Sequence, residues 1–348
     1  MRFLSAPFSA TLALLTVFCT FAPRAEAARI HGITLSTHTD GGDWAGPGLE
    51  PALDAMIEVG ADWIQIHPYA WIRDDGTVAF RAVDPARRPA WLERPIAEAH
   101  ARGLRVFVKP HLGYWGSRFD WRGAIEFEDP AARERFFRTY TDWITNLAAA
   151  TADADGFSVG TELDRLLEHE RQWRAVVAAV REVTAVPLTY AANWTHYREV
   201  GFWDALDVIG IQAYFPLTDR SPPTEPAVRA AWRRILGEVS AYGRRLDRHV
   251  VFTELGYNRS FDAAARPWEH RTDGPAAEAV QALCLRVALE EIELTPRVIG
   301  SFLWKWFPAP HQAGRNFALA TPRMRGVIRG VWTRDGALPP RAEEISGP

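Results

Sequence analysis

The sequence predicts an α/β fold, a single-domain (β/α)8 TIM barrel, and two observations lead to this prediction. Short apolar segments alternate along the chain with longer amphipathic segments, which is typical of a parallel sheet with helical crossovers. Eight such units follow one another without a change of composition that would mark a linker, and this number fits a closed barrel better than an open sheet. No glycine-rich turn follows the first strand, which argues against a dinucleotide-binding fold.

The elements can be assigned in order from their periodicity. Strands are expected where buried apolar runs end in small or polar residues, at 30–36, 63–67, 104–109, 157–163, 187–191, 207–212, 250–254 and 298–305. Helices are expected where proline or polar residues begin an amphipathic segment, at 47–59, 89–102, 130–150, 170–183, 226–242 and 275–291. Residues 306–348 show no clear element. The longest insertions, 113–129 and 258–274, follow the third and seventh strands, and whether they close the cleft decides between endo and exo cutting.

Residues 1–27 are expected to be a signal peptide. Arg2 begins the segment, residues 11–22 are apolar, and Ala25-Glu26-Ala27 supplies a small-x-small cleavage pattern. The apolar stretch is shorter than the roughly 20 residues that span a membrane, so no membrane span is expected. We therefore expect a secreted or periplasmic protein whose folded domain covers residues 28–338, with a loose tail at 339–348.

Composition excludes some classes of function. The net charge of −3 carries no signature of polyanion binding, so a nucleic-acid partner is not expected. After removal of the signal segment only Cys284 remains, which excludes an internal disulfide. Tryptophan is abundant, with 15 residues, and several lie at predicted strand ends. Aromatic rings at a cleft are suited to stacking against the apolar faces of sugar rings.

Two predicted strands end in the same tripeptide, Thr-Glu-Leu, and place Glu162 and Glu254 at their carboxyl ends. In a β/α barrel the carboxyl ends of the strands form the catalytic face. Each glutamate alone fits equally well as a solvated residue capping a strand. Their repetition in the same register favours a pair of carboxyl groups that face each other across the barrel mouth.

The other strand ends carry hydrogen-bonding and aromatic side chains. The candidate substrate-binding residues are His67, Lys109, His111, Thr161, Asn193, Gln212, Tyr214 and Trp304, and Gln65, Trp194 and Lys305 lie at strand ends beside them. Two carboxylates surrounded by such groups suit an uncharged, polyhydroxylated substrate such as a polysaccharide or oligosaccharide. A glycosidic bond is cleaved by one carboxylic acid that protonates the leaving oxygen and one carboxylate that attacks or directs water. A separation of about 5–5.5 Å indicates retention, and about 6.5–9.5 Å indicates inversion.

Several of these residues also fit a different role. Trp304 is also compatible with packing of the barrel, in which case Trp306 would be the sugar platform. His67 and His111 are also compatible with strand-end residues that bond to their neighbours. Lys109 is compatible with a Schiff-base lysine, although two facing glutamates favour a sugar contact. A metal site formed by His67, His111 and Glu162 is not supported, because these residues lack any known ligand spacing. A serine hydrolase is not supported either, because the sequence contains no Gly-x-Ser-x-Gly elbow. No metal or cofactor is expected.

Five segments resemble glycoside hydrolase family 113 of clan A, a family of endo-β-1,4-mannanases. They are Lys-Pro-His (109–111), Val-Gly-Thr-Glu-Leu (159–163), Gln-Ala-Tyr-Phe-Pro-Leu (212–217), Phe-Thr-Glu-Leu-Gly-Tyr (252–257) and Phe-Leu-Trp-Lys-Trp (302–306). The resemblance implies that Glu162 is the acid/base and Glu254 the nucleophile. It also implies that Tyr214 holds the nucleophile and that Trp304 floors the subsite on the non-reducing side.

The chain departs from the wider clan at one position. Many clan members carry asparagine immediately before the acid/base, where it binds the sugar 2-hydroxyl, whereas this chain has Thr161. The 2-hydroxyl of mannose is axial, so a different partner is compatible with a mannoside. The sequence therefore predicts a retaining hydrolase of β-1,4-mannan or manno-oligosaccharides. The alternatives are a hydrolase of another β-glycan or cell-envelope polysaccharide, and an inactive glycan-binding barrel.

Overall fold

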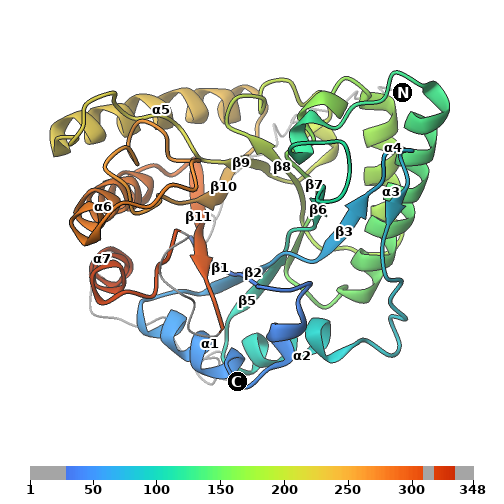
Figure 1. Ribbon diagram of the computed structural model, residues 1–348, viewed down its shortest axis with the longest axis horizontal. Helices are drawn as coiled ribbons and strands as arrows, with labels where there is room; N and C mark the ends of the chain where they lie inside the picture. The colour runs from blue at the N-terminus through green and yellow to red at the C-terminus, as the bar shows by residue number, and fades with distance from the viewer. Residues whose placement is uncertain (1–28, 309–316, 334–348) are drawn as a thin grey trace, which may run out of the picture.

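The computed structural model describes residues 29–308 and 317–333, and these form a closed eight-stranded barrel surrounded by helices (Figure 1). Every barrel strand pairs in parallel with its neighbours in sequence order. The strands are β1 (Ile30–Leu35), β2 (Trp63–Ile66), β5 (Arg105–Val108), β7 (Gly156–Thr161), β8 (Leu188–Asn193), β9 (Ile209–Gln212), β10 (Val250–Leu255) and β11 (Val298–Trp306). The predicted (β/α)8 barrel is confirmed. The signal segment 1–27 and the tail 339–348 lie outside the described residues.

The barrel closes where β1 meets β11. Ile30 pairs with Gly300, and the two backbones approach so closely that a Cβ on Gly300 would lie 2.0 Å from the Ile30 carbonyl oxygen. Gly300 also has φ of +143°, a conformation that side-chain-bearing residues rarely adopt. Glycine is therefore required at this contact by both backbone conformation and space.

Helices form the outer ring, as Figure 1 shows. Six of them lie within a few residues of the expected segments: α1 (Leu49–Glu58), α2 (Ala90–Ala101), α3 (Pro130–Ala150), α4 (Glu170–Arg181), α5 (Glu225–Arg245) and α6 (Glu278–Glu293). Between β8 and β9, where the sequence suggested no helix, the described chain has only the short 3-10 turn η4 (Trp203–Ala205). Within the described ranges, no helix has the length and hydropathy needed to cross a membrane.

A seventh α-helix, α7 (Pro322–Trp332), corrects the expectation that residues after 306 contain no element. Thr321 caps the helix by accepting a hydrogen bond of 3.2 Å from the Met324 amide, and Pro322 occupies its first turn. The helix buries Met324, Ile328, Val331 and Trp332, whose spacing places them on one face. Arginines between these positions obscure the apolar pattern in the sequence.

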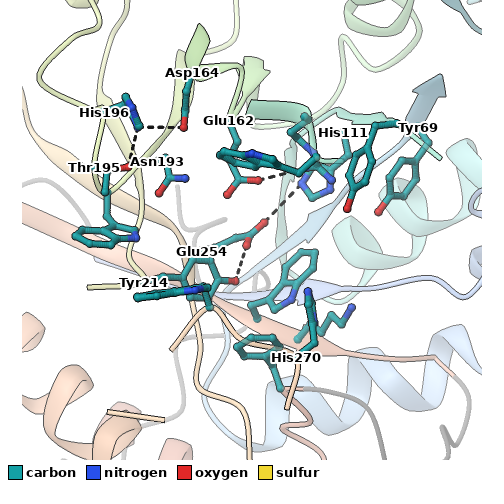
Figure 2. A pocket seen from close by; sticks show the side chains of 18 of the residues that line it. Tyr69, His111, Glu162, Asp164, Asn193, Thr195, His196, Tyr214, Glu254 and His270 are labelled. Atoms are coloured by element: carbon teal, nitrogen blue, oxygen red, sulfur yellow. Dashed lines mark hydrogen bonds and ion pairs between the residues drawn. The ribbon is translucent and has the colours of Figure 1, made fainter. Parts of the chain in front are cut away.

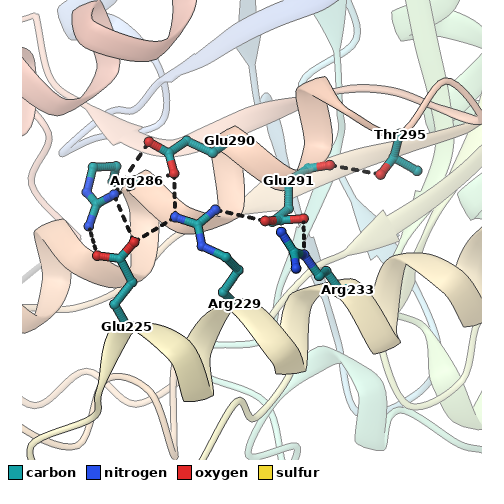
Figure 3. A network of polar contacts seen from close by, with 7 residues as sticks. All are labelled: Glu225, Arg229, Arg233, Arg286, Glu290, Glu291 and Thr295. Carbon is teal, nitrogen blue, oxygen red and sulfur yellow. Dashed lines mark hydrogen bonds and ion pairs between the residues drawn. The ribbon is translucent and has the colours of Figure 1, made fainter.

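Helices α5 and α6 are joined by a network of ion pairs (Figure 3). The Arg229 guanidinium reaches Glu225 at 2.7 Å on its own helix and both Glu290 and Glu291 on α6, at 2.7 and 2.8 Å. Arg286 on α6 reaches back to Glu225 at 2.6 Å. One arginine thus bridges three carboxylates across the helix pair.

A small sheet lies at the side of the barrel mouth and extends toward α3 (Figure 1). Strands β3 (Tyr69–Ile72), β4 (Val78–Ala79) and β6 (His111–Gly113) form it in the order β4-β3-β6. No strand was expected between the strand at 63–67 and the helix at 89–102, so this sheet is a finding of the structure. Tyr69 pairs with His111, which fixes both side chains at the mouth.

The barrel interior changes character from one end to the other. Its lower layer is an apolar cluster of Trp63, Phe107, Val251 and Phe302. Above it the interior is polar: the amide of Gln65 donates to the Thr34 hydroxyl at 2.9 Å, and buried groups from β5, β9 and β10 follow. The packed floor supports a polar layer at the carboxyl ends of the strands, where the candidate site lies.

Candidate active site

An open cleft of about 630 Å3 lies over the carboxyl ends of the barrel strands (Figure 2). Both glutamates that the sequence singled out line it, and Figure 2 shows their carboxyl groups pointing into the same space. The lining is mainly aromatic and polar, from Tyr69, His111, Tyr114, Trp115, Trp121, Arg122, Glu162, Asp164, Asn193, Trp194, Thr195, His196, Tyr214, Glu254, Trp268, His270, Trp304, Lys305 and Phe317. The repeated Thr-Glu-Leu segments are therefore brought together.

Glu254, on β10, is held by three neighbours. The Lys109 ammonium forms an ion pair with Oε1, the Tyr214 hydroxyl donates to Oε2 at 2.6 Å, and His111 Nε2 lies 3.6 Å from Oε1. Burial opposes ionisation of this carboxyl, but the adjacent Lys109 charge outweighs it and holds the pKa of Glu254 well below its usual range. Glu254 is an ionised carboxylate at neutral pH.

Glu162 follows β7 and has a different environment. Its backbone adopts φ of +53°, a strained conformation for a residue other than glycine. Burial raises the pKa of Glu162, and the Glu254 charge raises it further, while Arg122, with NH1 at 3.7 Å, partly opposes the shift. Burial, rather than the proximity of the two carboxyl groups, is the larger cause of the upward shift. Glu162 thus tends to keep its proton.

Two carboxyl groups with the same local sequence therefore have opposite tendencies. A lysine keeps one of them ionised, and burial raises the pKa of the other. Such a pair supplies a nucleophile and a proton donor in one cleft, which is the requirement for displacement at an acetal carbon.

Four predicted binding residues lie beneath the cleft rather than on its wall. Lys109, His67, Gln212 and Thr161 are at most 2% exposed. Thr161 donates its hydroxyl to the Pro110 carbonyl at 2.9 Å, and Gln212 accepts from the Thr253 hydroxyl at 2.8 Å. These residues position their neighbours in this structure instead of facing the open cleft.

The two predicted histidines stack on each other, with ring centroids 4.9 Å apart. Burial and the nearby cationic side chains lower the pKa of His67 and of His111 well below the usual value, so both rings are neutral. His67 contacts the Ser36 hydroxyl at 3.2 Å, whereas His111 lines the cleft beside Glu254. The described residues contain no group of three or more potential metal ligands.

Trp304, not Trp306, lies at the cleft. Trp304 packs against Tyr214 and Phe317 while lining the cavity, whereas Trp306 belongs to the main core cluster. The Lys305 ammonium lies 4.7 Å from the centroid of the Trp304 ring. Burial lowers the pKa of Lys305 to about 8. Asn193, at the end of β8, also lines the cleft.

Sequence reasoning missed several residues that line the cleft. Arg122 comes from the short turn η2 (Arg122–Ala124), and Trp268 and His270 come from the loop that follows β10. Loop residues carry no periodic signal that relates them to a strand end. Asp164 could have been found from the sequence, because it follows Glu162 by only two residues.

The fold and the paired carboxyl groups define the class of barrel hydrolases that cleave glycosidic bonds. The sequence model of glycoside hydrolase family 113 matches residues 33–316, and the chain belongs to this family. It is therefore a glycoside hydrolase that acts on a saccharide substrate. No curated protein sequence shows a significant match to the chain.

Solved structures agree on the fold. A family 113 β-1,4-mannanase superposes with a TM-score of 0.77 at 22% identity, over 88% of this chain and 99% of that one. The family 113 β-mannanase of Alicyclobacillus acidocaldarius gives 0.75 at 22% identity, over 88% and 98%. A family 5 mannosidase from Rhizomucor miehei gives 0.58 at 11% identity, over 89% and 93%.

Proposed function

We propose that this protein is a retaining glycoside hydrolase that cleaves β-1,4-mannosidic bonds in mannan or manno-oligosaccharides. The observation that carries the proposal is the pair of carboxyl groups that face one cleft with different neighbours. Lys109 and Tyr214 stabilise the ionised Glu254, while burial favours the protonated Glu162.

The reaction proceeds in two steps. Glu254 attacks the anomeric carbon as Glu162 transfers its proton to the leaving oxygen, so the glycosidic C–O bond breaks and a glycosyl ester of Glu254 forms. Glu162, now ionised, removes a proton from water, which attacks the anomeric carbon and releases Glu254. Because His111 is neutral, Lys109 is the charged partner of Glu254.

The mannoside assignment rests on family membership and on the cleft lining. Three of the similar structures are family 113 β-mannanases, and the family is matched over most of this chain. Trp304 offers an aromatic face beside the nucleophile, as the stacking of a sugar ring requires. Thr161 turns its hydroxyl to Pro110, so recognition of the sugar 2-hydroxyl falls to other groups.

The direct test compares wild type with Glu254→Ala on soluble mannan, glucomannan, xylan and β-glucan, following new reducing ends. Mannan cleavage that the variant loses by about 10^3-fold or more supports the proposal. Cleavage of another glycan, lost in the same way, moves the substrate and keeps the mechanism. Full activity of the variant contradicts the role of Glu254, and a wild type that binds but cuts nothing supports a binding-only barrel.

We further propose that the protein is exported, as secreted or periplasmic. The support is the sequence of residues 1–27, with its apolar stretch and Ala25-Glu26-Ala27. Expression of the full chain in a bacterial host, followed by N-terminal sequencing of the exported fraction, is expected to give a chain that begins at residue 28. Retention in the cytoplasm with an uncut N-terminus would contradict it.

A further inference from the structure

A third carboxylate lies in the cleft, and the two-step reaction does not use it. Asp164 begins the turn η3 (Asp164–Leu166), two residues after Glu162. His196 follows β8, and its Nδ1 lies 3.0 Å from Asp164 Oδ2. Both residues line the cleft, and Figure 2 shows the pair beside Glu162.

The aspartate of this pair is buried. Its side chain is 2% exposed, and neither oxygen accepts a well-aligned hydrogen bond from a described residue, so the imidazole of His196 is the ionisable group that it contacts. Burial raises the pKa of Asp164 to about 7, and the Glu162 and Glu199 charges add to the shift while Asn193 opposes it. A buried carboxylate without a partner is costly, so the contact with His196 has an energetic reason.

The histidine of the pair is accessible from the cleft. Its side chain is 35% exposed, and its Nδ1 contacts both Asp164 and the Thr195 hydroxyl, the latter at 2.7 Å. Because Nδ1 is engaged within the protein, Nε2 is the ring nitrogen left for a ligand. Among the described residues, none forms a hydrogen bond or ion pair with Nε2 of His196.

The position of the pair indicates which part of a substrate it meets. Asp164 follows Glu162 by two residues and lies beside it in Figure 2, whereas Lys109 and His111 are the groups gathered around Glu254. Since the proposed acid protonates the leaving oxygen, the departing sugar lies on the Glu162 side. Trp194, two residues before His196, stacks with Trp268 in the same cleft, with ring centroids 5.9 Å apart, and Trp268 is 43% exposed.

We propose that Asp164 and His196 form the binding site for the sugar that leaves. His196 Nε2 bonds a hydroxyl of this sugar, and Asp164 is a positioning residue that fixes the imidazole ring. The stacked Trp194 and Trp268 provide the adjoining aromatic wall. This inference rests on the proposed function and names the site that distinguishes a sugar leaving group from any other.

The test compares two substrates with the same manno-oligosaccharide on the non-reducing side. One releases a sugar, and the other releases nitrophenol, which has no sugar hydroxyls for His196 to bind. His196→Ala is expected to lower kcat/KM about tenfold or more on the oligosaccharide and to change it less than about twofold on the aryl glycoside. Asp164→Asn is expected to give a smaller loss with the same selectivity, and His196→Gln to restore part of it.

Two controls separate the possible failures. His100→Ala removes a comparable histidine–aspartate contact, 2.9 Å to Asp155 outside the cleft, and is expected to change neither substrate. Glu254→Ala is expected to abolish both activities, and its retention of both would overturn the proposed function together with this site. Equal effects of His196→Ala on the two substrates, whether no loss or the same loss, would overturn the leaving-sugar site alone.

Discussion

At the scale of single residues, the two glutamates differ only through their neighbours. Both follow a threonine at a strand end, yet Lys109 and Tyr214 bond to Glu254, whereas Glu162 has Arg122 at 3.7 Å. A buried carboxyl group beside an ammonium ionises readily, because the positive charge offsets the cost of burial. A buried carboxyl group whose nearest cation lies farther away ionises less readily. The division of roles thus depends on one lysine, and this can be tested by mutation.

Removal of the lysine charge is expected to change the pH dependence of activity. In Lys109→Met the pKa of Glu254 rises, because burial is no longer outweighed. The nucleophile is then protonated to a higher pH, so the acidic limb of kcat/KM against pH moves to higher pH, with about 10^2-fold less activity at about pH 5–6. Tyr214→Phe removes only one hydrogen bond and is expected to move the limb less. An unchanged limb in Lys109→Met would contradict this account.

The two glutamates are expected to affect stability with opposite signs. A carboxyl group whose pKa is depressed in the folded protein stabilises the fold above its unfolded pKa, and this stability is lost as pH falls through the folded pKa. A carboxyl group whose pKa is raised in the folded protein contributes its stability below the unfolded pKa, and this stability is lost as pH rises through the folded pKa. At about pH 8, therefore, Glu162→Gln is expected to raise Tm, and Glu254→Gln, which leaves Lys109 buried without its partner, to lower it. Thermal unfolding at that pH measures both, and shifts of the same sign would count against the assigned environments.

At the scale of elements, the contact of β1 with β11 closes the barrel through Gly300. Gly300→Ala is expected to destabilise the fold by about 2 kcal/mol or more, because the added Cβ meets the Ile30 carbonyl at a positive φ. Gly237→Ala on α5 is the control, since nothing lies within 4 Å of its added Cβ, and alanine is expected to be neutral or stabilising there. Urea unfolding gives both values, and equal stability of the two variants would refute the role of Gly300 in closure.

The pairing of α5 with α6 depends on Arg229. Arg229→Met is expected to cost about 2 kcal/mol, because it removes a cation from Glu290 and Glu291, whose side chains are only 10% and 6% exposed. Arg234→Met breaks an exposed pair with Glu238 and is expected to cost less than about 0.5 kcal/mol. Chemical unfolding compares them, and similar losses would show that the bridge between the helices contributes no more than a surface pair.

At the scale of the whole molecule, the barrel could be predicted from the sequence because each strand is a nearly continuous apolar run. β7 and β10 are buried throughout, so their boundaries and their terminal glutamates are visible in the sequence. Helix α7 was missed because arginines separate its apolar residues along the sequence. The small sheet with Tyr69 was missed because its strands are only two to four residues long.

Of the site residues, only those at strand ends could be predicted from the sequence. The catalytic candidates and the positions of Tyr214, Asn193 and Trp304 follow from the strand assignment. The ion pair of Lys109 with Glu254 does not, because it joins side chains 145 residues apart and depends on which way each points inside the barrel. Arg122 and His196 lie on loops whose course depends on tertiary packing.

The central claim is that Glu254 forms a covalent bond with the sugar while Glu162 acts as acid and base. The most direct test incubates the wild-type enzyme with a 2-deoxy-2-fluoromannosyl fluoride, which slows breakdown of the intermediate, and maps the adduct by peptide mass spectrometry. We expect one added glycosyl group, on Glu254. An adduct on Glu162, or release of the inverted sugar without any adduct, would contradict the account.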